Sequence, residues 1–265
     1  MAPRYSFTLF MALTLAGSTR AADEGEPLFS RHVEALFSRL GCNGGTCHGA
    51  VKGQNGFRLT LFAADPALDH ERLLRELGGR RLNLHRPEAS LLLTKAAGQV
   101  SHGGGKRLDV SSPEYALLAR WIGAGARLDA VEQSRLVRLR VTPAEHTARP
   151  GETYPLRVEA TFADGSAEDV TRLCSFESRD RHVADVSADG RVQVNGPGDA
   201  ALIVRYRAEP ALALVLVPRP GQEPFPDVAP HNFIDRHVLD KLRQLNLPPA
   251  PLADDVTFLD RKSVV

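Results

Sequence analysis

A short run, residues 41–49, constrains this chain most, because it contains Cys42, Cys47 and His48 in that order. Two thiols followed at once by an imidazole are typical of covalent c-type haem attachment. In that chemistry the thiols add to the haem vinyl groups and the imidazole ligates the iron. The usual spacing has two residues between the cysteines, whereas here there are four small or flexible ones. The motif predicts haem c, held by both cysteines and ligated by His48.

Two other interpretations of the same residues remain open. Cys42 and Cys47 could form a disulfide, although such a short loop gains little chain entropy from a cross-link. They could also bind zinc, but a structural zinc site needs about four Cys or His ligands. The remaining cysteine, Cys174, lies far along the chain in what we expect to be another domain.

The N-terminus has the features of a secretory signal peptide, which we assign to residues 1–21. Arg4 supplies the positive charge, residues 7–16 are apolar, and residues 19–21 form a small-x-small cleavage site. Export agrees with the haem prediction, since c-type haem is attached outside the bacterial cytoplasm. We therefore expect a periplasmic or cell-surface protein.

The rest of the chain excludes two classes of partner. After the N-terminus no stretch is long and apolar enough to span a bilayer, so we expect no membrane span in the mature chain. The net charge is only +1, which gives no general attraction to nucleic acid.

The segment that contains the motif is predicted to be helical. Helices are expected over residues 27–40, 66–77, 87–95 and 113–124. Gly41 should end the first helix, and Ser112 should cap the last one. His32 lies off the apolar stripe of the first helix, so we expect it to be solvated. Three apolar residues would either wall a haem pocket or form an ordinary helix core: Phe37, Leu118 and Trp121.

This order of parts resembles the class I cytochrome c fold, and more specifically the Planctomycete cytochrome C domain of large exported bacterial proteins. The resemblance covers about residues 28–128. It is carried by blocks at residues 42–49, 53–57, 90–93, 102–107 and 117–122. It implies an all-α, cytochrome c-like haem domain that exchanges electrons with an unidentified redox partner.

The motif itself does not specify the sixth iron ligand. Ordinary members of that fold use a methionine, but both methionines of this chain lie in the predicted signal peptide. A glycine-rich loop places His102 54 residues beyond His48, and its glycines would let the backbone approach the haem closely. We predict His102 as the second iron ligand, ahead of His70 and His85. A solvated His102, with a five-coordinate iron that keeps an open site, is the alternative.

The second half of the chain changes to short alternating segments with frequent turns, which predicts a β-sandwich over residues 135–218. Strands are expected at residues 137–141, 154–162, 184–186, 191–194, 200–206 and 212–217. Five blocks resemble a bacterial Ig-like domain of group two: residues 164–166, 169–171, 183–186, 189–192 and 197–200. That resemblance implies a spacer or adhesion module, and we expect Cys174 to fill a core position there.

The C-terminal part begins with a proline-rich linker, residues 219–230. An amphipathic helix is predicted over residues 231–245. Residues 231–265 resemble the opening of a large domain of unknown function, so we expect a truncated helical start of that domain, loosely held against the rest.

The predicted fold class is therefore multidomain: an all-α cytochrome c-like domain, an all-β Ig-like sandwich and a short helical stub. The leading function is an exported mono-haem cytochrome module that transfers electrons, with Lys106 and Arg107 either pairing with the haem propionates or solvated. The alternative is a non-haem secreted binding or adhesion protein with a disulfide-stabilised N-terminal domain. A polysaccharide hydrolase is a weaker third possibility, because no catalytic constellation stands out.

Overall fold

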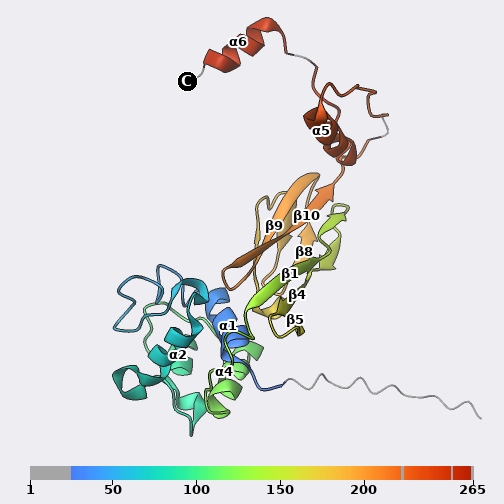
Figure 1. Ribbon diagram of the computed structural model, residues 1–265. Coiled ribbons are helices and arrows are strands. Elements are labelled where there is room, and N and C mark those ends of the chain that lie inside the picture. Colours follow the sequence, from blue (N-terminus) through green and yellow to red (C-terminus); the bar gives the residue numbers. More distant parts are fainter. Residues whose placement is uncertain (1–24, 222–223, 252, 264–265) are drawn as a thin grey trace, which may run out of the picture.

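The computed structural model describes residues 25–221, 224–251 and 253–263, so the predicted signal peptide lies outside the described residues. The chain is elongated and has three parts (Figure 1). A helical domain at one end contacts a β-sandwich, and two C-terminal helices follow at the far end. Among the described residues, no helix is both long and apolar enough to cross a bilayer.

The helical domain contains α-helices joined by shorter helical turns. Its elements are η1 (Phe29–Val33), α1 (Glu34–Arg39), η2 (Leu61–Ala63), α2 (Pro66–Arg75), η3 (Glu76–Gly79), η4 (Pro87–Ala89), α3 (Leu91–Ala96) and α4 (Pro113–Gly123). The predicted cap of the last helix is confirmed, since the side chain of Ser112 accepts a hydrogen bond from the Tyr115 N–H. The predicted continuous helix over residues 87–95 is wrong. Its chain breaks at Ser90, which is extended and whose buried hydroxyl accepts a bond from the Asn83 N–H.

The first and last helices of this domain pack together. The rings of Phe29 and Trp121 lie 5.2 Å apart, and the Trp121 indole N–H donates to the carbonyl of Arg127 at 3.0 Å. A buried indole with its donor satisfied is a stable core element. This packing fixes η1 and α1, which lead directly into the cysteine motif.

The second domain is built from short antiparallel strands, with one parallel pair, β2 and β10. Its elements are β1 (Leu136–Thr142), β2 (Glu145–Thr147), β3 (Thr153–Pro155), β4 (Arg157–Phe162), β5 (Ala167–Asp169), η5 (Thr171–Leu173), β6 (Ser175–Ser178), β7 (Ala184–Val186), β8 (Arg191–Val194), β9 (Gly198–Tyr206) and β10 (Glu209–Val217). The sheets have the orders β1-β4-β5, β2-β10-β9-β6 and β3-β8-β7. The sequence pattern did not predict the short strands β2, β5 and β6.

Alternation along the longer strands builds the core of the sandwich. On β9, Leu202, Val204 and Tyr206 are fully buried while the intervening residues are less so. Cys174 is also fully buried, and its thiol donates to the carbonyl of Val170 at 3.2 Å. Its predicted core position is confirmed.

The two domains meet around Arg31 of η1. Its side chain is only 4 % exposed and pairs with Asp164 at 2.5 Å and Glu168 at 2.6 Å. Its guanidinium also lies 4.0 Å from the ring centre of Phe162. A planar guanidinium suits two carboxylates and an aromatic face at once. We call this set of four side chains the Arg31 clamp.

Neighbouring residues reinforce the clamp. The Tyr206 hydroxyl donates to the backbone carbonyl of Arg31 at 2.6 Å. His32 lies 2.9 Å from Glu168 and is 22 % exposed, so the expectation that His32 is solvated is wrong. Apolar periodicity alone could not show that the polar side of this helix faces a second domain.

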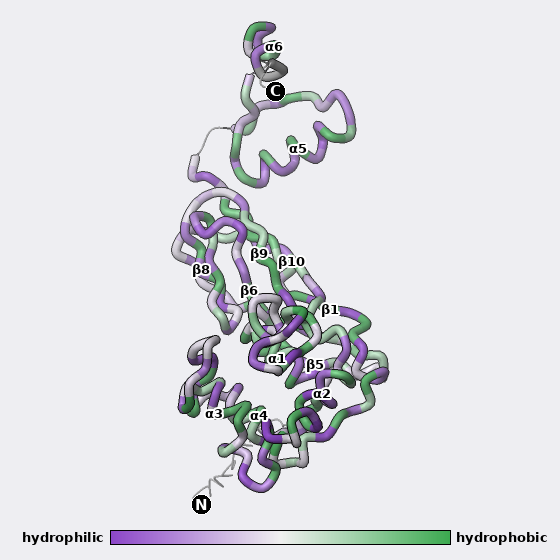
Figure 2. The backbone as a smooth tube through the Cα atoms, turned by 90° about the vertical axis from the view of Figure 1, so that its left-hand side faces the viewer, coloured by the Kyte–Doolittle hydropathy of each residue, from purple (hydrophilic) through white to green (hydrophobic). Residues whose placement is uncertain are grey.

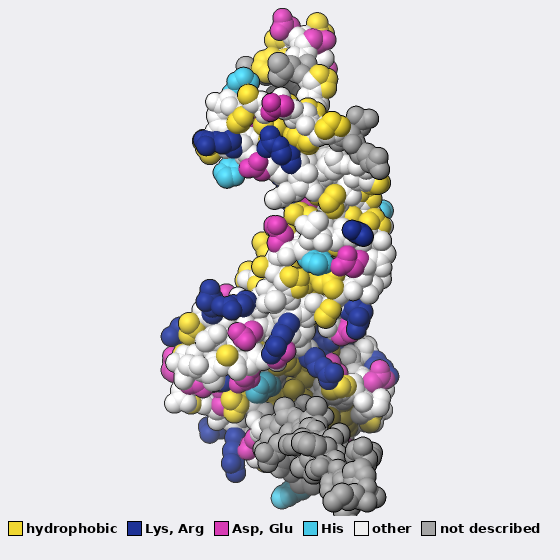
Figure 3. All heavy atoms as spheres, turned by 90° about the vertical axis from the view of Figure 1, so that its right-hand side faces the viewer, with side chains coloured by type: hydrophobic (Ala, Val, Ile, Leu, Met, Phe, Trp, Pro, Cys, Tyr) yellow, Lys and Arg dark blue, Asp and Glu magenta, His cyan; other side chains and the backbone are white. Residues whose placement is uncertain are grey.

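The C-terminal part contains α5 (Phe233–Gln244), as predicted, and α6 (Asp255–Ser263), which was not predicted. The Arg219 N–H bonds to the carbonyl of Leu245 at 2.9 Å, and Lys241 pairs with Asp199 of the sandwich at 3.3 Å. Polar and apolar residues alternate along α5 (Figure 2), and apolar side chains lie on the surface of these helices (Figure 3). The exposed apolar residues of α5 are Phe233, Ile234 and Val238.

Arg31→Ala should lower the free energy of unfolding by about 2–3 kcal/mol. The substitution leaves Asp164 and Glu168 without their cationic partner at an interface where both are only partly solvated. Urea unfolding followed by tryptophan fluorescence measures the change, since Trp121 lies in the helical domain. Arg138→Ala, at an exposed site on β1, is the matched control and should change stability by less than about 0.5 kcal/mol. Equal effects of the two variants would contradict the clamp.

Candidate functional site

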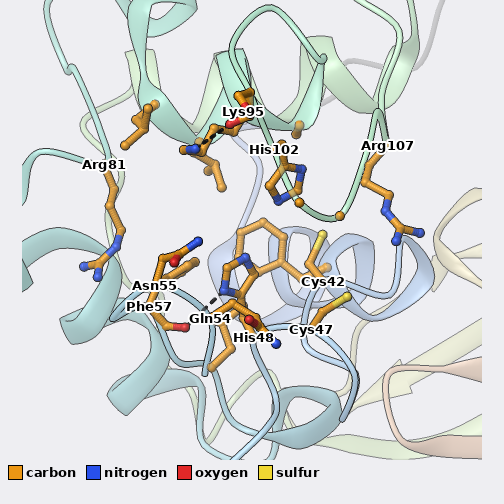
Figure 4. A pocket seen from close by; sticks show the side chains of 18 of the residues that line it. Cys42, Cys47, His48, Gln54, Asn55, Phe57, Arg81, Lys95, His102 and Arg107 are labelled. Atoms are coloured by element: carbon orange, nitrogen blue, oxygen red, sulfur yellow. Dashed lines mark hydrogen bonds between the residues drawn. The ribbon is translucent and has the colours of Figure 1, made fainter. Parts of the chain in front are cut away.

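A cavity of about 830 Å³ opens in the helical domain beside the cysteine motif. It contains all of the predicted site residues, Cys42, Cys47, His48 and His102, although they come from two separate loops (Figure 4). Phe37 from α1, Leu91, Leu92 and Ala96 from α3, and Phe57 and Leu59 from the turn after the motif supply its apolar wall. The structure therefore brings the four predicted site residues together around one cavity.

The motif folds as a tight loop directly after α1. Gly41 has φ +76°, a left-handed conformation that favours glycine and ends the helix as predicted. The Cys42 N–H bonds back to the Phe37 carbonyl at 2.8 Å, and the His48 N–H bonds to the Cys42 carbonyl at 2.9 Å. The four residues between the cysteines are thus accommodated in a compact loop that returns His48 to Cys42.

The two histidines face one another across the cavity. Their ring centres are 6.3 Å apart and their planes differ by only 8°. His48 Nδ1 lies 3.0 Å from the Phe57 carbonyl, and His102 Nδ1 lies 2.9 Å from the Gly105 carbonyl. A carbonyl only accepts, so each Nδ1 carries the hydrogen and each Nε2 is left as a free lone pair. Metal-binding histidines are oriented in the same way by backbone carbonyls.

This separation fits one metal atom between the rings. Two metal–nitrogen bonds of about 2 Å each need about 4 Å, which the 6.3 Å between the ring centres can accommodate if the two Nε2 atoms face each other. Burial lowers the pKa of His48, although its bond to the Phe57 carbonyl opposes the change. A lowered pKa keeps the imidazole neutral, as a metal ligand must be.

The glycines around His102 give its side chain room. A Cβ on Gly104 would lie only 3.0 Å from His102 Cε1, and Gly105 has φ +71°. The other candidate ligands lie elsewhere. His70 Nε2 bonds to the Ala126 carbonyl at 2.7 Å, outside this cavity, and His85 is exposed.

Both cysteines of the motif are free thiols. They lie on the same side of the cavity, near His102 and Arg107 (Figure 4). Burial raises the pKa of the Cys42 thiol to about 12, so this side chain is a neutral thiol at physiological pH. The described structure therefore shows no disulfide between Cys42 and Cys47.

The zinc alternative lacks ligands. Among the described residues, no group of three or more His, Cys, Asp or Glu is placed to hold a metal ion. Haem iron takes only axial ligands from the protein, so a facing pair of histidines satisfies the need of haem but not that of zinc.

The charged part of the cavity lining is entirely basic. It consists of Arg80, Arg81, Lys95 and Arg107, and no Asp or Glu lines the cavity. Arg81 is 5 % exposed and is held in place by backbone carbonyls, including that of Arg72 at 2.6 Å. Lys95 donates to the Ser101 carbonyl at 2.7 Å. Two propionates would find several cationic partners here.

Some predictions about the lining need correction. Of the three predicted wall residues only Phe37 lines the cavity, whereas Leu118 and Trp121 belong to the helix core. Arg107 lines the cavity as one alternative proposed, but Lys106 pairs with Asp109 instead. The basic residues contributed by the turn before α3 and by α3 itself were missed, because sequence alone does not show which charges of a basic turn face inward.

Comparisons with known proteins concern the second domain. Residues 138–204 match the family described as bacterial Ig-like domain (group 2), so this half of the chain contains an Ig-like domain, as predicted. The matched residues do not include the helical domain, and its resemblance to a cytochrome domain stays a prediction. No curated protein sequence matches the chain.

Several solved structures resemble part of the chain. The S-layer protein SbsC, domains 4 and 5, is 15 % identical over 31 % of this chain and 51 % of that one, with a TM-score of 0.27. SbsC domains 5–6 are 15 % identical over 34 % and 47 %, with a TM-score of 0.28. An intimin mutant of EHEC O157:H7 is 16 % identical over 31 % and 46 %, with a TM-score of 0.24. The chain thus spans about half the length of these structures.

Gly49→Ala should disrupt the loop of residues 41–49, because a Cβ at Gly49 would lie 2.1 Å from the carbonyl oxygen of Asn43. Forced backbone movement of this kind costs about 1–3 kcal/mol. Gly45→Ala is the matched control in the same loop, since its nearest neighbour, Leu61, is 3.9 Å away. Chemical denaturation of both variants measures the difference, and equal stability would show that the loop is not closed as described.

Proposed function

We propose that the helical domain binds one covalent haem c and exchanges single electrons with a redox partner protein, in an exported chain of the periplasm or cell surface. Cys42 and Cys47 would attach the haem, and His48 and His102 would ligate its iron. Haem supplies reversible one-electron chemistry at the iron when it is bound.

One observation carries this proposal. Two imidazoles from distant parts of the sequence lie nearly parallel at 6.3 Å, each with Nδ1 held by a backbone carbonyl. In an ordinary pair of loop histidines, water could hydrogen-bond to each ring as well as a carbonyl does. Nothing would then require both rings to be held by a backbone carbonyl and to lie parallel. The adjacent cysteines and a cavity lined by apolar and basic groups give further support.

The chain's own residues have separable tasks in this proposal. The carbonyls of Phe57 and Gly105 hold the Nδ1 sides of the two rings, which in the neutral imidazoles leaves Nε2 as the acceptor atom. The apolar wall excludes water, and Arg107 and Lys95 are placed to offset propionate charge. Bis-histidine ligation gives a lower reduction potential than methionine–histidine ligation. We therefore expect an electron carrier at the low-potential end of c-type cytochromes.

The test is a pyridine haemochrome spectrum on the full chain exported from a host with c-haem maturation machinery. The wild type should carry about one covalent haem per chain, and Cys47→Ala should lose covalent attachment at that residue. In the native absorption spectrum, recorded without pyridine, His102→Ala should keep the covalent haem but change the low-spin spectrum to that of an iron with an open site. His85→Ala, at an exposed position outside the cavity, is the control and should change neither.

This proposal is overturned if the wild-type protein carries no haem and if His48 and His102 exchange protons freely with the solvent. A second candidate would then stand: a non-haem surface protein that binds or adheres through its second domain. The match of residues 138–204 to the bacterial Ig-like family favours that candidate. A disulfide between the two motif cysteines, found by mass spectrometry, would support its N-terminal half.

A further inference from the structure

A second group of polar residues lies buried behind the attachment loop. Glu34 of α1 and Asp69 of α2 are both fully buried. Neither carboxylate oxygen of Glu34 has a hydrogen-bond partner among the described residues. Buried polar atoms are almost always paired, so two unpaired oxygens on one carboxyl group require an explanation.

Asp69 is satisfied, unlike Glu34. Its two oxygens accept from the Thr60 N–H at 2.7 Å and the Thr60 hydroxyl at 2.6 Å, and Arg72 lies 3.8 Å away. Asp69 is one of the groups that raise the pKa of Glu34, so the two buried carboxyl groups are neighbours. Two neighbouring buried carboxylates cannot both be ionised without a large cost. Because Thr60 donates twice to Asp69 whereas neither oxygen of Glu34 has a hydrogen-bond partner among the described residues, the proton belongs on Glu34.

Other charged and titratable groups around Glu34 are few. Arg207, after β9, attracts the ionised form of Glu34, but it is engaged with the Ser30 carbonyl at 3.0 Å. The Cys42 thiol of the attachment loop also faces Glu34. Burial first, and Asp69 second, raise the pKa of Glu34 well above its usual value.

We infer that Glu34 and Asp69 form a proton-binding site that holds one proton at neutral pH between α1 and α2. Release of the proton leaves two like charges in the core beneath the attachment loop and weakens the packing of these helices. The site goes beyond haem binding and does not depend on it, because both residues lie outside the haem cavity.

The sign of the pH effect follows from the raised pKa. Glu34 in the unfolded chain titrates near about pH 4.3. Between that value and its higher pKa in the folded protein, the folded state holds more protons than the unfolded state. Stability from this group is therefore full below about pH 4.3 and is lost as the pH rises through the folded pKa.

The test measures urea midpoints of the full chain from acid to alkaline pH, with or without bound haem. Glu34→Gln supplies a permanent N–H donor to Asp69 without a titrating proton. As the pH rises, the urea midpoint of this variant should therefore decrease by at most half of the wild-type decrease. Glu71→Gln, exposed on α2, is the control and should keep the wild-type slope. An unchanged slope in Glu34→Gln would overturn the inference.

Infrared spectroscopy gives a second readout that does not depend on how stable the variant is. The wild type at neutral pH should show the C=O stretch of one protonated carboxyl group, which moves on full deuteration and is missing in Glu34→Gln. Its absence from the wild type would show that both carboxyl groups are ionised and would overturn the inference. Since neither measurement requires haem, failure here is distinguishable from failure of the proposed function.

Discussion

Two backbone carbonyls, those of Phe57 and Gly105, determine what the cavity can do. Each accepts the Nδ1–H of one histidine and so fixes its tautomer and direction. Without these bonds nothing in the described structure would fix the orientation of the two rings. The carbonyls in turn depend on local geometry: Phe57 follows a turn closed by paired bonds with Gln54, and Gly105 needs its left-handed backbone. The chemistry of the site therefore rests on main-chain conformation as much as on the residues that would bind a ligand.

Sequence alone predicted a large part of this arrangement. A cysteine–histidine motif is local, so Cys42, Cys47 and His48 could be recognised from their order. His102 was found because glycines flank a histidine in a loop of suitable position. Helix caps such as Ser112 and the buried face of α4 were also visible, since both depend on neighbours in the sequence.

The parts that could not be predicted depend on tertiary contacts. His32 lies off the apolar stripe, yet it is paired with Glu168 from a strand more than a hundred residues away. Trp121 has the size and the sequence position expected of a residue that lines a pocket. Its side chain instead lies in the helix core, where the indole N–H donates to the carbonyl of Arg127. Glu34 looks like an ordinary charge at the start of α1, and only three-dimensional packing shows that it is buried against Asp69.

The Arg31 clamp has a mechanical consequence for the chain as a whole. The clamp joins the sandwich to η1, and η1 continues into α1 and from there into the attachment loop without a flexible linker. The helical domain and the sandwich are thus held together twice, by the chain between α4 and β1 and by the Arg31 clamp (Figure 1). Loss of the clamp would leave the chain between α4 and β1 as the main connection, and the base of the cavity would lose one of its supports.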